Sequence, residues 1–209
     1  MARLYDISQA LRPDLPVWPG DTAFRAEPNW EHGDGCPVAV ARLTLSPHSG
    51  AHADAPLHYD PLGLDIADVD LEPYLGVARL IDLRGLEGPV RADDLAPRMT
   101  GDVRRLLIRT YDRFPHEAWS SRFTAVAPEA IAFLAGAGVG LVGIDGPSLD
   151  PQDSRTLEAH WAADRAGMRI LEGLVLDEPP PDDYELIALP LKLVGVDASP
   201  VRAVLRSLS

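Results

Sequence analysis

Twenty prolines and seventeen glycines are scattered along the 209 residues and divide the chain into short elements joined by turns. Seven brief runs are rich in β-formers or alternate between polar and apolar residues, and they predict strands. These runs are Val38–Ser46, Val77–Leu83, Arg105–Thr110, Val139–Ile144, Met168–Leu176, Tyr184–Leu189 and Val201–Leu205. Two segments, Pro128–Ala137 and Ser154–Ala166, predict helices that end at glycines. The pattern favours a mixed α/β fold with more strand than helix.

We expect a single domain over residues 1–209, because the length corresponds to roughly 1.4 typical domains and no linker or repeat divides the chain.

The net charge of −13 argues against nucleic acid or an anionic membrane as a partner, and it is compatible with cation binding. The single cysteine, Cys36, excludes an intrachain disulfide and fits a reducing compartment. No uncharged run reaches the ~20 residues that span a bilayer, so we expect a cytoplasmic protein.

The sequence lacks a functional form of two common motifs, the dinucleotide-binding fingerprint and the serine hydrolase motif. Gly138, Gly140 and Gly143 have the spacing of a dinucleotide-binding fingerprint, but they end a predicted helix and enter a strand, whereas the fingerprint requires the reverse order. The Gly-x-Ser-x-Gly segment typical of α/β-hydrolases does not occur in the sequence. The sequence therefore indicates neither dinucleotide binding nor serine hydrolase chemistry.

Three of the six histidines lie within eleven residues, in a segment whose prolines and glycine disfavour a helix. In an extended chain, residues of equal parity face the same way. The even-numbered edge is a row of potential metal ligands: His48, His52, Asp54 and His58. The odd-numbered edge carries small residues that would let the segment press against a core: Ala51, Ala53 and Ala55.

A metal ion could join these side chains if the segment bends. His48 and His52 would be ~13 Å apart along an extended strand, whereas metal–nitrogen bonds are about 2 Å long. Gly50 lies midway and permits the backbone angles that a bend needs. Two imidazoles and a carboxylate suit Zn²⁺ or Mn²⁺, and a further position left for water would make the site catalytic. This pattern favours metal binding over the alternative of surface histidines near a turn.

Other residues could complete a site, and each has a structural alternative. His58 is expected too far along the chain to bind the same ion, but placed to face what the ion binds, as a general acid or base. His160 has the spacing of a core histidine in the second predicted helix. Glu172 is expected on an apolar strand face, where either a cation or an arginine such as Arg169 could pair with it. Asp145 is a candidate to orient a ligand histidine.

The histidine segment resembles the signature of the cyclase-like metal hydrolases. The resemblance is carried by His48-x-Gly50-x-His52-x-Asp54-x-Pro56-x-His58. Four further segments are similar to the bacterial kynurenine formamidases, which are arylformamidases: Tyr5-Asp-Ile-Ser, Pro16-Val-Trp18-Pro-Gly-Asp21, Gly143-Ile-Asp-Gly-Pro-Ser148 and Arg169-Ile-Leu-Glu172-Gly-Leu. The similarity runs from Leu4 to Leu205. It implies a compact α/β domain, with flanking helices around a mixed, β-barrel-like sheet, usually in a homodimer.

The resemblance also implies a centre of two divalent metal ions, usually zinc, with Mn²⁺ or Co²⁺ also suited to the ligands. The implied ligands of the first ion are His48, His52 and Asp54. Asp54 would bridge to the second ion, which His160 would also bind, and Glu172 would contact both ions. His58 would be the proton donor and acceptor, and Trp18 would contact an aromatic formamide substrate.

The implied reaction is the hydrolysis of N-formyl-L-kynurenine to L-kynurenine and formate, in tryptophan degradation by the kynurenine pathway. Two alternatives stay open at this point. The first is a related hydrolase that acts on another aromatic amide or on a lactam such as isatin, with the same ligands. The second is a non-catalytic protein in which the metal is purely structural, and this alternative leaves His58 without a role.

Overall fold

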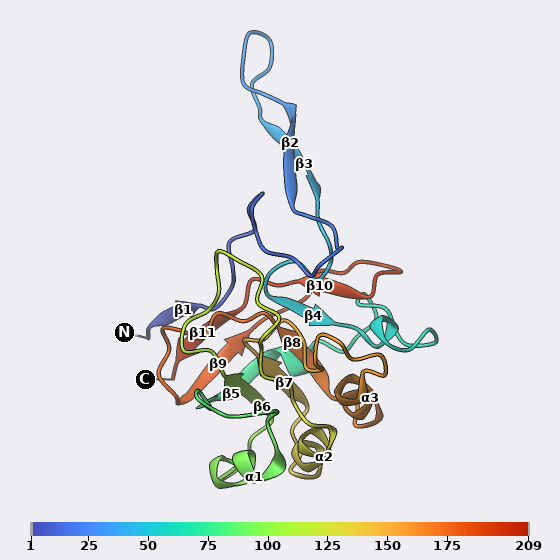
Figure 1. Cartoon of the computed structure of the whole chain (residues 1–209). Helices are drawn as coiled ribbons and strands as arrows, with labels where there is room; N and C mark the ends of the chain where they lie inside the picture. The colour runs from blue at the N-terminus through green and yellow to red at the C-terminus, as the bar shows by residue number, and fades with distance from the viewer. Residues whose placement is uncertain (1, 209) are drawn as a thin grey trace.

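A curled nine-stranded sheet, three helices and a separate β-hairpin make up the computed structural model, which describes residues 2–208 (Figure 1). The strands lie across the sheet in the order β1 (Leu4–Asp6), β11 (Val204–Ser207), β9 (Asp183–Ile187), β5 (Leu75–Asp82), β6 (Arg105–Arg109), β7 (Leu141–Ile144), β8 (Arg169–Glu172), β4 (His52–Asp54) and β10 (Ala198–Pro200). The helices are α1 (Ala92–Leu95), α2 (Pro128–Gly136) and α3 (Glu158–Arg165). Short 3₁₀ turns form at Pro56–His58, Glu72–Tyr74 and Ala96–Arg98.

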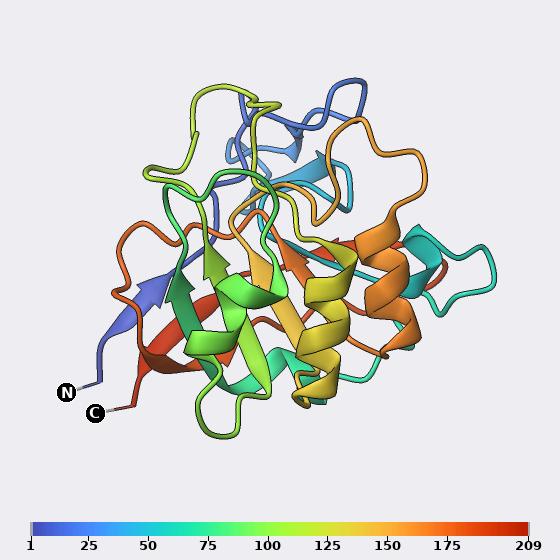
Figure 2. The ribbon, with the colours of Figure 1, turned by 60° about the horizontal axis from the view of Figure 1, so that its bottom comes forward.

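The middle of the sheet is built from parallel strands. β5, β6, β7 and β8 pair in parallel, and the chain passes through α1, α2 and α3 between them. The three helices lie side by side over the same part of the sheet in Figure 2. The remaining strands pair antiparallel on either side. The structure confirms the predicted mixed α/β fold with a barrel-like sheet, and the carboxyl ends of β6, β7 and β8 meet at one edge, the usual place for ligands.

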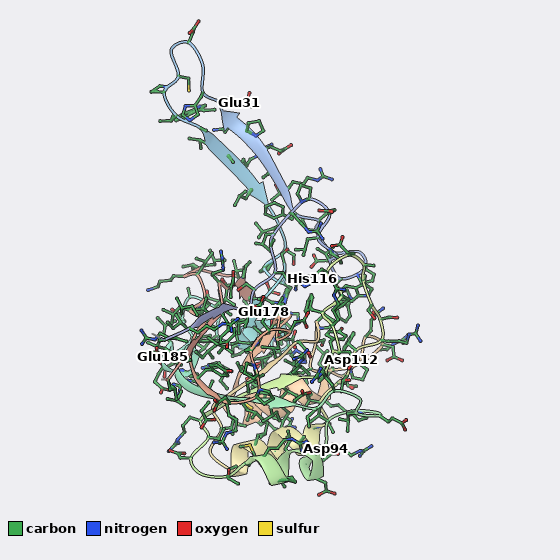
Figure 3. The ribbon with its side chains drawn as sticks, turned by 90° about the vertical axis from the view of Figure 1, so that its left-hand side faces the viewer. Glu31, Asp94, Asp112, His116, Glu178 and Glu185 are labelled. Carbon is green, nitrogen blue, oxygen red and sulfur yellow. The ribbon has the colours of Figure 1, made fainter. Side chains whose placement is uncertain are left out.

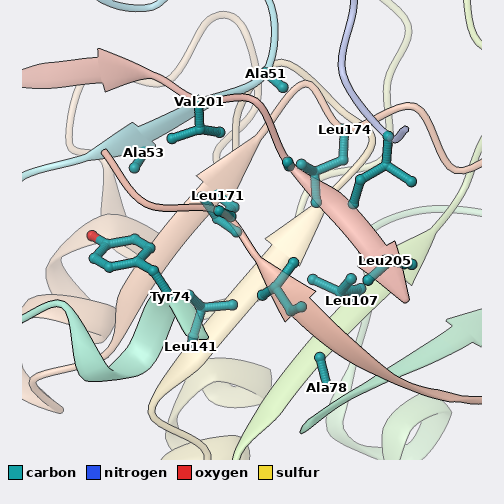
Figure 4. Close-up of a cluster of buried hydrophobic side chains, with 14 of the residues drawn as sticks. Ala51, Ala53, Tyr74, Ala78, Leu107, Leu141, Leu171, Leu174, Val201 and Leu205 are labelled. Carbon is teal, nitrogen blue, oxygen red and sulfur yellow. The ribbon is translucent and has the colours of Figure 1, made fainter. Parts of the chain in front are cut away.

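The central strands bury both of their faces, which explains their continuous apolar runs. Leu107, Leu141 and Leu171 enter the cluster enclosed by the curled sheet, which Figure 4 shows. Ile108 and Ile170, one position away along their strands, belong instead to the cluster formed with the helices. The alternation of side chains along each strand thus supplies two separate cores.

The glycines that match a nucleotide fingerprint have roles in folding. Gly138 follows α2 with a φ of 86°, a conformation that ends a helix. Gly143 lies in β7 at a point where a Cβ atom would come within 2.5 Å of Leu107 Cδ2 and 2.9 Å of Leu174 Cδ1. Close packing against the Leu107 and Leu174 side chains therefore requires a glycine there.

Each predicted strand and helix overlaps an observed one, but several boundaries differ. The predicted strand Met168–Leu176 is too long, because Gly173 has a φ of 65° and ends β8. Leu174 then enters the cluster inside the curled sheet, on the opposite side from Ile170. The second helix begins later than predicted because Leu157 adopts a left-handed conformation with a φ of 49°. No helix within residues 2–208 has the length and hydrophobicity needed to span a bilayer.

The hairpin of β2 (Arg25–Trp30) and β3 (Val40–Thr44) stands away from the rest of the molecule (Figures 1 and 3). The two strands form a sheet of their own, and every residue in them is exposed. The exposed side chains include the apolar Trp30, Val40 and Leu43. An isolated two-stranded hairpin is only marginally stable in water.

Candidate metal centre and adjacent pocket

Side chains along the segment of β4 alternate between a face that packs in the core and a face of potential metal ligands. Ala51, Ala53 and Ala55 are buried in the cluster inside the curled sheet, as the parity of the segment predicts. His52 and Asp54 alternate with them and are buried on the other face. β4 pairs with β8 so that His52 lies opposite Glu172. The sheet therefore brings a histidine and two carboxylates together from separate segments.

The predicted bend at Gly50 is present, and it brings His48 to the same place. Gly50 has a φ of 69°, and the backbone N–H of Ser49 donates to the carbonyl of Ser46 at 3.0 Å in the turn before it. As a result, His48 Nδ1 lies 3.2 Å from Asp54 Oδ1. The Gly50 carbonyl accepts a hydrogen bond from His52 Nδ1 at 3.0 Å, which leaves His52 Nε2 facing the carboxylates.

Asp150 orients His160 at the start of α3. Its carboxylate accepts hydrogen bonds from the backbone N–H groups of Ala159 at 3.0 Å and His160 at 3.1 Å, and so caps the helix. The same carboxylate lies 2.6 Å from His160 Nδ1. His160 Nε2 consequently faces Asp54 Oδ2 at 3.4 Å and Glu172 Oε1 at 3.3 Å.

The prediction that Asp145 orients a ligand histidine is wrong. Asp145 follows β7 and accepts hydrogen bonds from the hydroxyl and backbone N–H of Thr110, each at 2.7 Å, and from the backbone N–H of Tyr111 at 2.8 Å. Burial raises the pKa of Asp145 to about 6 despite these hydrogen bonds. Asp145 thus fixes the loop after β6, while Asp150 performs the orienting role. Sequence reasoning missed Asp150, whose only signal is its position ahead of the helix.

Four buried polar atoms converge without hydrogen-bond partners among the described residues. They are His52 Nε2, His160 Nε2 and both carboxylate oxygens of Asp54. Glu172 completes the group: its Oε2 lies 3.4 Å from His52 Nε2, and the N–H of Leu149 donates to its Oε1 at 2.7 Å. An unsatisfied buried polar group costs about 1–3 kcal/mol. A divalent cation would satisfy the facing lone pairs, so this donor set fits Zn²⁺ or Mn²⁺.

Charges in the cluster shift the pKa values of its members. Burial alone would lower the pKa of His48, but the hydrogen bond to Asp197 and the nearby Asp54 carboxylate outweigh burial and raise it to about 10. Burial would raise the pKa of Asp54, yet contacts with His160 and His48 hold it well below its usual range. Burial and the nearby Asp54 would raise the pKa of Glu172, but His160 and His52 lower it. The metal-free cluster therefore holds a proton on His48, which faces ionised carboxylates.

Cation binding should consequently release a proton from His48. The bound proton stabilises the folded metal-free protein below pH 6.5, and this stabilisation is lost as the pH rises towards about 10. A cation must displace that proton, so its affinity should rise up to about tenfold per pH unit across this window. Calorimetry in buffers of different ionisation enthalpy counts the released protons. The His48→Gln variant should release about one proton fewer, and an unchanged count would contradict this assignment.

His58 lies closer to the cluster than an extended chain predicts. Pro56–His58 forms a 3₁₀ turn, in which the N–H of His58 donates to the carbonyl of Ala55 at 3.0 Å. The His58 ring centroid is 4.3 Å from that of His48, and its nitrogens come within metal-sharing distance of Asp54 and His160. The turn shortens the path, so His58 faces the cluster on the side of Asp54 and His160. That His58 does not share the ion of His48, His52 and Asp54 stays a prediction. His58 Nδ1 lies 3.2 Å from a carboxylate that the sequence did not indicate, Asp197.

An aromatic pocket opens beside the cluster. His48 and His52 are among the residues that line it, together with four aromatic side chains: Trp18, Tyr111, Phe114 and Trp119. The rings of Trp18 and Trp119 meet edge to face with centroids 5.2 Å apart. The indole N–H of Trp119 donates to Gln152 Oε1 at 2.9 Å, which fixes its orientation. Trp18 therefore lies where the resemblance expects an aromatic substrate, with Trp119 as a second flat surface.

Known proteins have a similar fold and a related sequence. The Cyclase family model matches residues 5–151. Kynurenine formamidase of Maricaulis maris (strain MCS10) is 55% identical over 208 residues, and that of Sphingopyxis alaskensis (strain DSM 13593 / LMG 18877 / RB2256) is 51% identical over 209 residues, with both chains fully covered in each case. A solved structure described as a potential metal-dependent hydrolase with cyclase activity superposes with a TM-score of 0.87, at 28% identity and full coverage of both chains.

Isatin hydrolases are more distant. Isatin hydrolase A from Labrenzia aggregata, solved with benzyl benzoate, superposes with a TM-score of 0.81 over 100% of this chain and 94% of its own. Its sequence identity is 22%, so the likeness concerns the fold alone. The full-length identity to two kynurenine formamidases is much higher. The chain therefore belongs to the cyclase family of hydrolases, and within that family to the kynurenine formamidases.

Proposed function

We propose that this protein is a metal-dependent arylformamidase that hydrolyses N-formyl-L-kynurenine to L-kynurenine and formate in tryptophan catabolism by the kynurenine pathway. The observation that carries the proposal is a cluster of unpaired buried ligand atoms beside an aromatic pocket, in a chain that matches kynurenine formamidases over its full length. The pocket offers flat surfaces for an aryl ring, and the cluster lies where the formamide group would then be placed.

We propose a centre of two divalent ions, most simply Zn²⁺. His48 and His52 would hold the first ion, His160 would hold the second, and Asp54 would bind both, since its two oxygens face different histidines. Glu172 would also contact both ions, because its oxygens face His52 and His160 separately. When bound, such ions polarise a carbonyl oxygen and lower the pKa of coordinated water towards neutrality.

The chain's own residues orient the substrate and move the proton. Trp18 and Trp119 would hold the aryl ring so that the formyl group reaches the cluster. Water adds its oxygen to the formyl carbon and gives up a proton, which His58 would accept. The carbon–nitrogen bond then breaks, and its electron pair stays on the aryl amine nitrogen. That nitrogen is a poor leaving group as an anion, so it needs a proton as the bond breaks. His58 is the proposed donor through Nε2, because Nδ1 is engaged by Asp197.

Metal analysis combined with an activity assay tests this function. Purified protein should contain up to two transition-metal ions per chain and should release formate from N-formyl-L-kynurenine. Strong chelation should abolish turnover, and added Zn²⁺ or Mn²⁺ should restore it. Full activity in metal-free protein would refute the proposal. A substrate panel that includes isatin separates the formamidase from a lactam hydrolase, and the 22% identity to isatin hydrolase gives no support to the latter.

We propose further that the protein is a homodimer in which the β2–β3 hairpin packs against a second copy. The support is the isolated position of the hairpin and the exposure of Trp30 and Leu43, 57% each. Leu43→Asp should therefore lower the mass of the particle from dimer to monomer in light scattering. Leu62→Asp, on a loop where the leucine is 93% exposed, is the matched control and should stay dimeric. A monomeric wild-type protein would contradict this proposal.

A cytoplasmic location also stays a prediction, which rests on the single cysteine and on the absence of any long apolar segment in the sequence. The acidic net charge of −13 keeps nucleic acid and anionic membranes outside the proposed set of partners. The proposed partners are the small aromatic formamide and the second subunit.

A further inference from the structure

One carboxylate oxygen joins two histidines that the proposed mechanism uses differently. Asp197 Oδ2 lies 3.0 Å from Nε2 of His48 and 3.2 Å from Nδ1 of His58. The two rings are tilted by 49° with centroids 4.3 Å apart, so both can reach the same oxygen. His48 is a proposed metal ligand, whereas His58 is the proposed proton donor.

The sheet holds Asp197 at this position. The residue directly precedes β10, in which Ala198 pairs with Asp54 of β4. The backbone N–H of Ala55 donates to the carbonyl oxygen of Asp197 at 2.9 Å. Its side chain is 38% exposed, so its placement comes from this strand pairing and from the two histidines rather than from burial.

The two contacts determine which ring nitrogens keep a lone pair. An ionised carboxylate only accepts hydrogen bonds, so each histidine must carry its hydrogen on the nitrogen that faces Asp197. On His48 this is Nε2, so Nδ1, which lies 3.2 Å from Asp54, is the nitrogen that can offer a lone pair to a cation once its proton is displaced. On His58 it is Nδ1, which leaves Nε2 as the nitrogen that can exchange a proton with the substrate.

We propose that Asp197 is a positioning residue that fixes the tautomer of His48 and of His58 with one oxygen atom. Through His48 it directs a lone pair towards the cation site, and through His58 it keeps Nε2 available for proton transfer. The same logic makes a carboxylate necessary behind the histidine of a serine protease triad. The proposal rests on the proposed formamidase activity only where turnover is measured.

Histidine ring NMR tests the proposal without any assay of activity. In zinc-loaded, ¹⁵N-histidine-labelled protein, the His58 signals are identified by their loss in His58→Gln. Wild-type protein should show the hydrogen of His58 on Nδ1. Asp197→Ala should move it to Nε2 or to a mixture of both forms, and Asp197→Asn provides a second variant of unchanged volume. A His58 hydrogen that stays on Nδ1 in both variants would overturn the proposal.

Measurements of metal affinity and turnover distinguish a positioning role of Asp197 from a purely structural one. Asp197→Ala should weaken zinc binding by roughly 10–100-fold, and excess zinc should restore occupancy. At saturating zinc, kcat should fall about 10²-fold with KM little changed. In a His58→Ala background the same substitution should cost less than about threefold, because its catalytic effect passes through His58. The assignment would be overturned if Asp197→Ala lowered kcat as much in the His58→Ala background as in the wild type. It would also be overturned if excess zinc failed to restore full metal occupancy in Asp197→Ala.

The matched control is Asp183→Asn. Asp183 is also 38% exposed and also forms a pair, with Arg79, but it lies on β9 away from the cluster. This variant should keep wild-type turnover, metal content and His58 tautomer, so equal losses in the two variants would indicate a general effect of lost ion pairs. If wild-type protein does not hydrolyse N-formyl-L-kynurenine, the proposed function fails, whereas the tautomer and zinc measurements still decide the role of Asp197.

Discussion

Asp54→Ala should yield a folded protein that binds neither metal ion and has no measurable turnover. Asp54 is 2% exposed, and its two oxygens face different partners: Oδ1 lies 3.2 Å from His48 Nδ1, and Oδ2 lies 3.4 Å from His160 Nε2. A carboxylate placed in this way can touch two ions about 3.5–4 Å apart. Its removal should cost more than the ~10²–10³-fold that follows the loss of one oxyanion donor. Elemental analysis and formate release measure the two effects.

His160→Ala is the comparison that gives the Asp54 result its meaning. His160 faces only one side of Asp54, so its loss should weaken mainly the second ion and leave about one ion per chain. Asp54→Asn should behave like Asp54→Ala while preserving side-chain volume, which separates lost coordination from a packing defect. Two ions retained in Asp54→Ala would show that the bridging assignment is wrong.

His58→Ala should keep its metal and its fold while turnover falls by about 10²-fold or more. The side chain is 31% exposed, so its truncation removes little packing. The loss should shrink for formanilides with electron-withdrawing ring substituents, because a more acidic leaving amine needs protonation less. For the wild type and the variant, the logarithm of turnover is plotted against the pKa of the leaving amine across such a series. The variant should give the steeper slope.

Two outcomes would contradict the proton-transfer role of His58. Loss of metal in His58→Ala would make the residue a ligand, a role that its proximity to Asp54 and His160 makes geometrically accessible. An equal rate loss across the whole formanilide series would indicate that His58 only positions the substrate. Tyr59→Phe, at the neighbouring position and with its ring 6.2 Å from that of His58, should leave both the metal content and the slope unchanged.

The sequence predicted the central strands because tertiary structure reinforces their local pattern. Leu107 and Ile108 are buried on opposite faces, so their run reads as continuously apolar. The strands β1 and β10 have three residues each, too few for a pattern, and they exist because the sheet pairs them. The sequence did not predict β2 for a different reason. Every residue of β2 is exposed, so no alternation of buried and exposed positions marks it as a strand.

Some residues of the candidate site could likewise be predicted from the sequence, and others could not. His48, His52 and Asp54 lie within seven residues, so their spacing and the bend at Gly50 could be read from the chain itself. Asp150 and Asp197 could not be predicted, because they reach their histidines only through the cap of α3 and the pairing of β10 with β4. The sequence offers many aspartates, and only the folded sheet shows which ones face an imidazole.

The ligand cluster draws on parts of the chain more than a hundred residues apart, from the turn before β4 to the end of β8. A cation held there closes these long loops in a chain whose lone cysteine cannot form an intrachain disulfide. Because only the folded chain gathers the ligands, free metal at a hundred times its dissociation constant would stabilise the folded state by about 2.7 kcal/mol. Scarcity of the metal would thus reduce the amount of enzyme as well as its activity, since unloaded chains would unfold and be degraded more often.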